Sequence, residues 1–492
     1  MTKSWVGLTV VFLIVLGLRL YFAFQTPYYS SDASYLHVRA TETILEGKIL
    51  WQDPLGYGGR TLVMSPLFDA ILAFFTLFMP LSLVFKLIPN IFASLLVIPA
   101  YLIAHKLSQK NWTALFAAFF ASIIPAYFSN TFNHITPLTL AIPIFFFLAY
   151  AWLQMPKRAW IITFLSLLLV FVFLHPLSIV FVLSIGVYII LSSLEHLKPT
   201  NAEYELGLFS LFFALWAQFL LYKKLILFHG PSVIWQNIPK EMLSAFYSNI
   251  TIFDAIWQIG LVPLTGGTYA LYKTAFKTPQ KETQLLLAVT IVSTILLWFK
   301  LIDVTTGFIL LGITLALLFS QRIILFTNFI SETKISKYGP ALTVLILLSA
   351  LSTVVYPAYV ETKEQLSHTI TQEEITALGT LSQETPEDAT IIAPANYGNY
   401  ITAIAKRKNV IDEYFLLRPR INERYQDITR LYKTTFQTEA VELFDKYEAD
   451  YIVAPPGHKD IAYGNSQCFT RIHATNIQVY EKNPECKVRV VA

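Results

Sequence analysis

The sequence predicts a mostly α-helical, polytopic membrane protein with a small α/β domain at its C-terminal end. Hydrophobic residues make up 55% of the 492 residues and charged residues only 14%, with a mean hydropathy of +0.54. A soluble chain carries about a quarter charged residues. The apolar residues also fall in long runs rather than in helical stripes, which indicates bilayer spans. The net charge of +4 is small and dispersed, so nucleic acid is not an expected partner.

Eleven apolar runs have about the 17–25 residues that a bilayer core requires. They cover 5–24, 86–107, 111–127, 136–154, 158–173, 176–194, 205–222, 251–272, 283–300, 302–320 and 340–358. The first run is too long for a signal-peptide core and lacks a small-residue cleavage site, so we expect an uncleaved anchor. The apolar segment 66–83 lies between Pro66 and Pro80 and is expected to be a juxtamembrane or re-entrant helix. The count is therefore about eleven spans, with twelve or thirteen as alternatives.

Basic residues predict the orientation in the membrane. Lysines and arginines fall on every second connection between the predicted spans, and the side of the membrane with these connections is expected to be cytoplasmic. The residues are Lys106, Lys110, Lys157, Arg158, Lys198, Lys273, Lys277, Lys281, Arg322, Lys334 and Lys337. Eleven spans then place the N-terminus in the cytoplasm and the tail outside. We expect a transmembrane domain over 1–360, with a first external loop at 25–85 that carries juxtamembrane helices and a later external loop at 223–250. An extracytoplasmic α/β domain follows over 361–492.

The tail has ordinary soluble composition with alternating elements. Strand-like patches at Thr390–Ala393, Tyr451–Ala454 and Ile477–Glu481, together with helical periodicity at 439–448, indicate a small α/β domain. The two cysteines, Cys468 and Cys486, flank an expected hairpin. A disulfide is expected if the domain lies outside, and two free thiols if it lies in a reducing compartment. The spacing leaves both alternatives open.

The first external loop concentrates polar residues next to the first span. Asp32 lies about ten residues beyond that span, and His37, Arg39, Glu42 and Arg60 follow it. Charge beside the hydrocarbon boundary is costly and usually marks a site. The other unusual polar residues also fall on the predicted outer face. This one-sided clustering indicates an enzyme with an extracytoplasmic active site.

The order of these pieces resembles the catalytic subunit of oligosaccharyltransferase and related membrane glycosyltransferases of the C superfamily (GT-C), along most of the chain. In that family the first external loop carries an acidic residue, a Tyr-x-x-x-Arg helix and a Trp-x-x-Pro-x-Gly-Arg stretch. The matching pieces are Asp32, Tyr35–Arg39 and Trp51–Arg60. Glu241, ahead of FYSNITIFDAIWQIG, matches a later acidic position, and Lys300 in LLWFKLID matches an arginine that meets the donor phosphate. The segment Pro394–Ile401, followed by Ala405–Arg407, matches a Trp-Trp-Asp-Tyr-Gly motif and an Ala-x-Arg helix end.

The chain departs from that family in two places. Both tryptophans of the last motif are missing and its aspartate is Asn396, in the motif that reads the acceptor sequon in the family. The second external loop reads SNTFNHITP and lacks the acidic pair of the family, so it offers only Asn133 and His134. One of the three metal-ligating positions is therefore changed.

The resemblance implies transfer of a sugar or oligosaccharide from a polyprenyl-phosphate-linked donor to a protein, glycan or lipid acceptor at the membrane. It implies Asp32 and Glu241 as catalytic residues. A divalent cation, Mg²⁺ or Mn²⁺, would be held by Asp32, His134 and Glu241, since carboxylates suit such hard cations and a histidine suits Mn²⁺. The implied substrate-binding residues are Arg39, Arg60, Lys300, Asn396, Tyr397 and Arg407.

Each of these predicted site residues also has a possible purely structural role. Asp32 is a favoured N-cap for a helix starting at Ala33, Glu241 pairs with Lys240 on a solvated face, and Lys300 snorkels to the interface beside Asp303. His134 is a hydrogen-bonded loop histidine, Arg39 and Arg60 hold the loop to carboxylates such as Asp53 and Glu42, and Asn396–Gly398 is a turn. The functional alternative to a glycosyltransferase is a non-catalytic relative or a transporter with an external binding platform. A transporter should carry charges near the bilayer midplane, whereas most charges here lie at the outer span ends.

Overall fold

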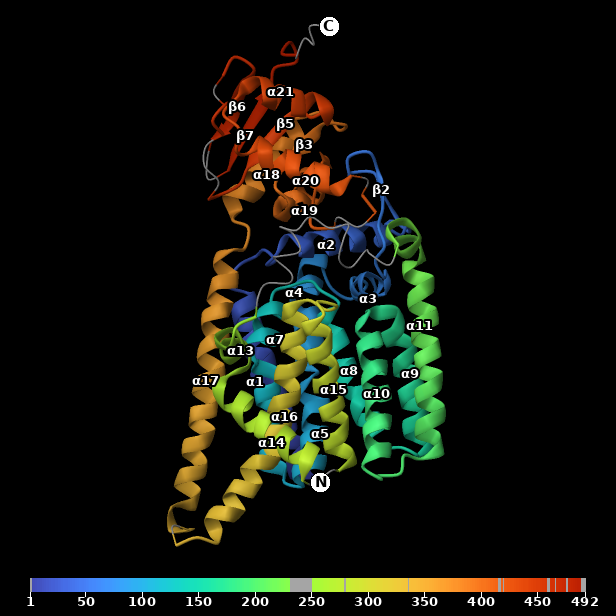
Figure 1. The fold of residues 1–492 in the computed structure, drawn as a ribbon. Coiled ribbons are helices and arrows are strands. Elements are labelled where there is room, and N and C mark those ends of the chain that lie inside the picture. Colours follow the sequence, from blue (N-terminus) through green and yellow to red (C-terminus); the bar gives the residue numbers. More distant parts are fainter. Residues whose placement is uncertain are drawn as a thin grey trace. The chain divides into compact units, whose positions relative to one another are not determined.

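The computed structural model describes residues 2–230, 250–277, 280–334, 336–414, 417–418, 420–457, 461–464, 466–474 and 477–487 (Figure 1). These residues form two compact units. Unit 1 comprises residues 2–27, 75–220 and 250–367, and unit 2 comprises 28–74, 221–230 and 368–487. Each unit is described by itself below.

Unit 1 is a helical bundle. By length and composition, seven helices of the described chain could cross a membrane, or eight if the bent pair α6–α7 counts as one. The seven are α1 (Thr2–Ala23), the continuous stretch of α4 (Leu81–Ser94) and α5 (Val97–Ser108), α10 (Leu177–Leu194), α11 (Asn201–His229), α15 (Lys281–Trp298), α16 (Val304–Ser331) and α17 (Gly339–Ser367). In Figure 1, α1 begins at the same end of unit 1 as the turn between α16 and α17.

The remaining predicted spans are helical but shorter or broken. The segments 136–154 and 158–173 contain α8 (Leu138–Trp152) and α9 (Arg158–Leu174), of 15 and 17 residues. The segment 111–127 contains α6 (Asn111–Ile123) and α7 (Pro125–Thr131), which are bent by 53°. Pro125 at the start of α7 removes a backbone donor and so favours this break. Every predicted span is thus helical, although fewer than eleven meet the length criterion.

The predicted span 251–272 is divided in two at a glycine. α13 (Ile252–Ile259) and α14 (Leu261–Phe276) meet at Gly260, whose φ is +97°. A Cβ there would lie 2.6 Å from Val354 Cγ2 and 3.0 Å from the Thr353 carbonyl oxygen. Only glycine fits this backbone conformation and this close approach, so the sequence breaks the helix at that point.

Unit 2 contains the first-loop elements and a five-stranded mixed sheet. The loop forms α2 (Asp32–Leu45), β1 (Gln52–Asp53), β2 (Arg60–Thr61) and α3 (Leu67–Phe75), the last being the short helix expected within 66–83. The sheet order is β4 (Lys408–Asn409), β3 (Thr390–Ile392), β5 (Tyr451–Ala454), β7 (Gln478–Lys482) and β6 (Phe469–Ala474). β4, β3 and β5 are parallel, whereas β7 and β6 run antiparallel to their neighbours.

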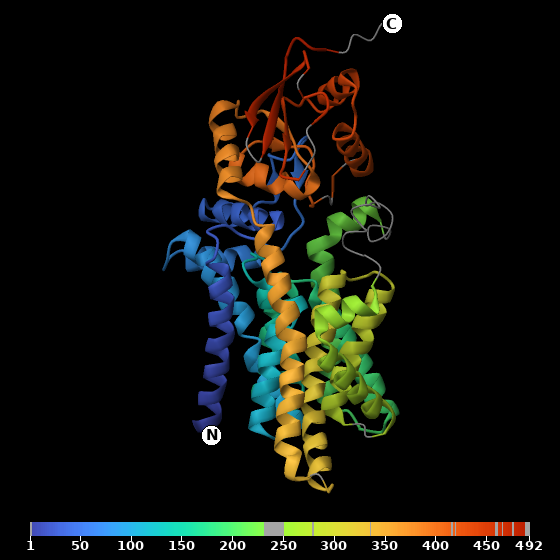
Figure 2. The same ribbon diagram turned by 90° about the vertical axis from the view of Figure 1, so that its left-hand side faces the viewer.

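Helices cover both faces of this sheet (Figure 2). Ile392 and Ile452 face α20 (Ile421–Leu431) and α21 (Gln437–Lys446), whereas Ile391 and Val453 face α18 (Gln372–Glu384) and the segment 397–405. Successive strand residues point to opposite faces, so each strand contributes to both cores. The α/β prediction is confirmed, and β3, β5, β7 and α21 lie where the sequence predicted them.

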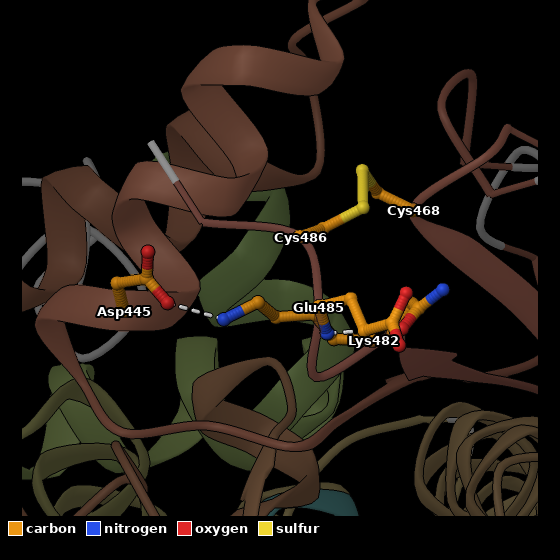
Figure 3. The surroundings of a disulfide bond; sticks show 6 residues. Asp445, Cys468, Lys482, Glu485 and Cys486 are labelled. Carbon is orange, nitrogen blue, oxygen red and sulfur yellow. Dashed lines mark hydrogen bonds and ion pairs between the residues drawn. A yellow bond between two sulfur atoms is a disulfide. The ribbon is translucent and has the colours of Figure 1, made fainter. Parts of the chain in front are cut away.

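The hairpin of β6 and β7 is closed by a disulfide. Cys468 precedes β6 and Cys486 follows β7, and their sulfur atoms are bonded across a sequence separation of 18 residues (Figure 3). Lys482 also pairs with Asp445 beside this bond. Closing a loop of this length stabilises a domain by about 3 kcal/mol in the chain-entropy model. The structure therefore selects the disulfide from the two alternatives that the spacing left open.

Candidate functional site

The first loop joins the edge of the unit 2 sheet through its backbone. Asn409 N–H donates to the Leu55 carbonyl oxygen at 2.8 Å, and Tyr57 N–H donates to the Asn409 carbonyl oxygen at 2.9 Å. The loop then turns at Gly58 and Gly59, which have φ values of +74° and +68°. Main-chain bonds to an exposed strand edge are a strong way to attach an extended segment. Residues 55–57 are thus attached to the edge of the C-terminal sheet at β4.

A buried chain of ion pairs reinforces this attachment. Arg39 Nη2 and Arg60 Nη2 lie 2.7 and 2.9 Å from Asp53 Oδ2. Arg60 Nη1 then lies 2.7 Å from Asp412 Oδ1, and Arg418 Nη2 lies 2.7 Å from Asp412 Oδ2. All five side chains are exposed by 9% or less. Arg39 and Arg60 therefore make the carboxylate contact to Asp53 that the structural interpretation predicted, and their roles in substrate binding remain predictions.

The arginines of these ion pairs keep the two aspartates ionised. Burial alone would raise the pKa of Asp412, but Arg418 and Arg60 outweigh it and hold the pKa below its usual value. Asp53 behaves in the same way, because Arg39 and Arg60 outweigh its burial. Both aspartates are therefore ionised at neutral pH. Ion pairs that are buried from solvent to this extent stabilise a structure only when every charged group keeps its partner.

Asp32 is held by the segment that matches the acceptor motif. It is the first residue of α2, and its buried carboxylate accepts from Asn399 Nδ2 at 2.6 Å and from Tyr400 N–H at 2.9 Å. The N-cap position is Ser31 rather than Asp32, and no side chain caps this helix. The expected capping role is therefore wrong, because the carboxylate is directed to residues 399 and 400 instead.

The environment of Asp32 disfavours its negative charge. Burial raises its pKa well above 3.8, and the charge of Glu413 raises it further, against the smaller effect of its two hydrogen bonds. Burial and the neighbouring Asp412 raise the pKa of Glu413 as well. Carboxylates whose pKa values are raised by burial and by a neighbouring negative charge are typical of functional sites.

The donor atoms around Asp32 suit a hard cation. Asn399 is fully buried, and its Oδ1 accepts no hydrogen bond within the described part of the chain. The oxygens of Asp32, Glu413 and Asn399 are of the type that Mg²⁺ and Mn²⁺ prefer. Among the described residues, however, no three histidine, cysteine, aspartate or glutamate side chains are grouped closely enough to hold a metal. The predicted ligand Glu241 lies outside the described residues, so the three-ligand set stays a prediction.

The other predicted residues of the acceptor segment differ in exposure. Asn396 is exposed in the middle of a 3₁₀ turn, whereas Tyr397 is buried and its hydroxyl donates to Glu374 Oε1 at 2.9 Å. Gly398 lies so close to the segment that follows β4 that a Cβ would be 2.4 Å from the Ile411 carbonyl oxygen. This glycine is required by close packing and not by its φ of −69°. The segment is thus a turn, as the structural interpretation predicted, and it is also packed into the domain.

Arg407 is fully engaged inside the C-terminal domain. Its Nε donates to Thr385 Oγ1 at 3.0 Å, and its Nη2 donates to the carbonyl oxygens of Ser382 and Thr385, both at 2.6 Å. These bonds tie the end of α18 to the start of β4. A role in substrate binding remains a prediction for Arg407, and these contacts give it a structural role.

Two predicted residues lie in unit 1. Lys300 follows α15 with a φ of +54° and is exposed. His134 follows α7, and burial lowers its pKa to about 4, so the ring is neutral at pH 7. Its Nε2 is buried and has no hydrogen-bond partner among the described residues. A neutral imidazole with a free nitrogen is the form that ligates metals, which fits the predicted role of His134.

Sequence reasoning missed the residues that organise unit 2. Asp412 and Glu413 are adjacent carboxylates in the apolar string NVIDEYFLL, and this composition was a usable signal, since buried carboxylates are rare without a partner. Asn399 lies inside the motif segment but carries no signal of its own. Only the folded chain shows that its amide meets Asp32.

Solved structures have a similar fold. AglB, the oligosaccharyltransferase of Archaeoglobus fulgidus in complex with an inhibitory peptide and a dolichol-phosphate, matches 92% of this chain and 69% of its own, with 16% identity and a TM-score of 0.70. ArnT from Cupriavidus metallidurans bound to undecaprenyl phosphate matches 99% of both chains, with 12% identity and a TM-score of 0.59. The mycobacterial arabinofuranosyltransferase AftD matches 98% of this chain and 40% of its own, with 12% identity and a TM-score of 0.63.

The chain has the GT-C membrane glycosyltransferase fold. No protein-family model and no curated protein matches the sequence. The identities of 12–16% show a shared fold, and the predicted GT-C architecture of a membrane helix bundle with a C-terminal α/β domain is confirmed. The GT-C neighbours and the apolar helices together indicate a multi-pass membrane protein.

Proposed function

We propose that this protein is a membrane glycosyltransferase of the oligosaccharyltransferase type, which transfers a sugar or oligosaccharide from a polyprenyl-phosphate-linked donor to an extracytoplasmic acceptor. The GT-C fold along nearly the whole chain supports the transferase class. The neighbours AglB and ArnT bind a dolichol-phosphate and undecaprenyl phosphate, which supports a lipid-phosphate donor. The Cys468–Cys486 disulfide supports an oxidising, extracytoplasmic location for unit 2. We propose a cytoplasmic N-terminus as well, as the distribution of lysines and arginines predicts.

The observation that carries the proposal is the contact of Asp32 with the acceptor-motif segment. Asn399 and Tyr400 fix both carboxylate oxygens, so one rigid unit presents the acidic residue together with the exposed Asn396. Glycosyl transfer requires an acidic group near the reacting centre and an acceptor positioned beside it. Held in this way, Asp32 would orient or deprotonate the acceptor.

A divalent cation bound at Asp32 would offset the negative charge that develops on the leaving phosphate. Such a cation would also return Asp32 to its ionised form, against the burial and the Glu413 charge that raise its pKa. His134 and Glu241 are the further ligands that we propose. One AglB structure is a complex with Zn and sulfate, which supports a metal in this class of protein.

The acceptor side is proposed to differ from a typical sequon reader. Asn396 is exposed but lacks the charge to accept strongly from a threonine hydroxyl, whereas the Tyr397 hydroxyl is already bonded to Glu374. We therefore assign acceptor contact to Asn396, and a supporting role to Tyr397. Lys300, exposed at the end of α15, is proposed to contact the donor phosphate as a point charge.

The test is a transfer assay with a polyprenyl-linked donor and several acceptors, including peptides with and without an Asn-x-Ser/Thr sequon. We expect transfer that depends weakly on the peptide's Ser or Thr. Asp32→Asn should lower the rate by about 10²-fold or more, and Lys300→Ala should weaken donor binding while Lys300→Arg preserves it. Asp445→Asn, which removes a half-exposed carboxylate of unit 2, is the control. Donor that binds but stays intact with every acceptor would indicate a non-catalytic relative.

A further inference from the structure

Unit 1 contains a cavity between three helices that the proposed reaction does not use. It has a volume of about 460 Å³ and lies between α14, α16 and the first turns of α17. This volume falls in the range of small-molecule sites, about 300–1,000 Å³. The lining residues that matter below are Tyr269, Lys273, Phe319, Arg322, Phe326 and Phe329. In Figure 1 these parts of α14, α16 and α17 lie at the end of unit 1 where α1 begins.

Two glycines of α14, Gly266 and Gly267, allow it to pack closely against α16 next to this cavity. A Cβ on Gly267 would lie 2.7 Å from the Leu315 carbonyl oxygen, so α14 and α16 touch at backbone distance there. The ring of Phe319 lies against Gly266 in the same way and forms one wall. Two turns further along α14 and α16, larger side chains line the cavity, namely Lys273, Phe326 and Phe329. The site is therefore shaped by packed helices and not by loops.

Two basic side chains face this cavity without a counter-ion. Arg322 is only 9% exposed, and its Nε has no hydrogen-bond partner among the described residues. Within the described chain, the guanidinium packs against the ring of Tyr269, whose centroid lies 5.7 Å from the guanidinium carbon. Lys273 lines the same cavity, and neither side chain forms an ion pair within the described chain.

A buried guanidinium needs more than an aromatic ring to offset its desolvation. The attraction between a cation and a ring is smaller than the desolvation penalty of a buried ion. An anion between Arg322 and Lys273 would supply the missing charge. The remaining wall is mostly apolar, with three phenylalanines among its residues, and Phe329 is largely exposed on the bundle surface, so an apolar chain can lie along it.

We propose that this cavity binds the phosphate headgroup of an anionic membrane phospholipid, with an acyl chain along Phe326 and Phe329. Basic pockets between membrane helices recognise lipid headgroups in this way. The occupant is a lipid because a cation pair beside an aromatic wall matches an amphiphile, whereas a free phosphate would leave the wall bare. The Lys and Arg distribution predicts this end of unit 1 to be cytoplasmic, so the lipid comes from the inner leaflet. This site is separate from the proposed transfer reaction.

The test is native mass spectrometry of the delipidated, full-length protein with three probes: phosphatidylglycerol, phosphatidylcholine and inorganic phosphate. We expect phosphatidylglycerol to be retained over phosphatidylcholine, and Arg322→Gln or Lys273→Gln to weaken its binding about fivefold each. Lys337→Gln, which removes an exposed positive charge from the neighbouring turn, is the matched control and should have no effect.

Each other outcome has a defined meaning. Equal retention of the two lipids, or an equal loss in Lys337→Gln, would overturn the site. Tight binding of inorganic phosphate without preference for the lipid would show a simple anion site instead. If Arg322→Gln does not fold, Lys273→Gln and Phe329→Ala are tested instead. Lys273 is partly exposed and Phe329 is largely exposed, so these changes should leave the fold intact. Activity of the enzyme is not a readout here, so failure of the transfer proposal would leave this result unaffected.

Discussion

Buried cations are handled in different ways in the two units. In unit 2, Arg39, Arg60 and Arg418 are paired with the carboxylates of Asp53 and Asp412. In unit 1, Arg19 is fully buried in α1 and has no carboxylate partner among the described residues. It donates to Thr131 Oγ1 at 2.9 Å and lies about 5 Å from the rings of Tyr127 and Phe128.

Lys86 follows the same pattern as Arg19. Its ammonium donates to the carbonyl oxygens of Ala23 and Thr26, both at 2.9 Å, and to the side chain of Asn133. These carbonyls lie at the C-terminal end of α1, where a helix leaves its last acceptors unsatisfied and carries a partial negative charge. Unit 1 therefore offsets Arg19 and Lys86 with dipoles and rings, while unit 2 offsets Arg39, Arg60 and Arg418 with full charges. Removing one partner should consequently cost more in unit 2.

The largest expected effect comes from Asp412→Asn. This change keeps the shape of the side chain but leaves Arg418 buried without a carboxylate, and it removes one of two partners from Arg60. Breaking a buried pair on one side costs about 3–5 kcal/mol. We expect this loss in the free energy of unfolding of unit 2, measured by denaturant unfolding of the purified protein.

The matched control for this prediction is Asp445→Asn. Asp445 pairs with Lys482 and is 37% exposed, so its loss should cost less than about 1 kcal/mol. If both variants unfold at the same denaturant concentration, the buried chain of ion pairs does not stabilise unit 2, and the contrast between the units disappears.

A smaller effect is expected from Lys86→Met in unit 1. The apolar replacement has a similar length but leaves the carbonyls of Ala23 and Thr26 without their donor. An unsatisfied buried acceptor costs about 1–3 kcal/mol. Hydrogen exchange of amides 20–26 should therefore become faster, since the end of α1 opens more easily.

Lys363→Met provides the comparison for Lys86. Lys363 is exposed and donates to Gln25 Oε1 at 3.1 Å, near the same end of α1. We expect little change in exchange from this variant. Equal acceleration by both changes would mean that positive charge in general, and not the buried cap, protects the helix end.

The smallest effect concerns Asp32, a buried carboxyl group without a cation partner among the described residues. Because its folded pKa is raised, its favourable contribution is complete below about pH 4 and is lost as pH rises through the folded pKa. The free energy of unfolding of unit 2 should therefore fall as the pH rises from about 4 toward neutrality in the metal-free protein. Asp32→Asn should flatten this dependence, because Asn399 can turn its free Oδ1 toward the new amide.

Glu413→Gln sharpens this prediction. The charge of Glu413 raises the pKa of Asp32, so neutralising it should lower the folded pKa, and the fall in stability should become smaller and end at a lower pH. A pH profile that is the same in all three proteins would show that Asp32 does not titrate in this range. An Asp32→Asn protein that is as stable as the parent at pH 7 yet inactive would separate the catalytic role of Asp32 from its structural role.

Several elements could be predicted from local sequence. Every apolar run folds into a helix, because hydrophobicity and length are properties of a short stretch of chain. The strands β3, β5 and β7 follow from β-branched and aromatic residues in alternation. The pairing of Arg39 and Arg60 with Asp53 was also foreseen, since the three residues lie within one loop. The sequence did not predict the break at Gly260, because the close approach of Val354 depends on a helix outside residues 251–272.

The sequence by itself determined the membrane class, the C-terminal α/β domain and the acidic and basic residues of the first loop. The tertiary structure alone decided which of these residues meet. Asp32 binds Asn399 across 367 residues, Arg60 pairs with Asp412 across 352, and Leu55 and Tyr57 extend the sheet beside β4. Hydropathy and periodicity act over a few turns of chain, whereas these contacts form only when the loop and the C-terminal domain fold around one core.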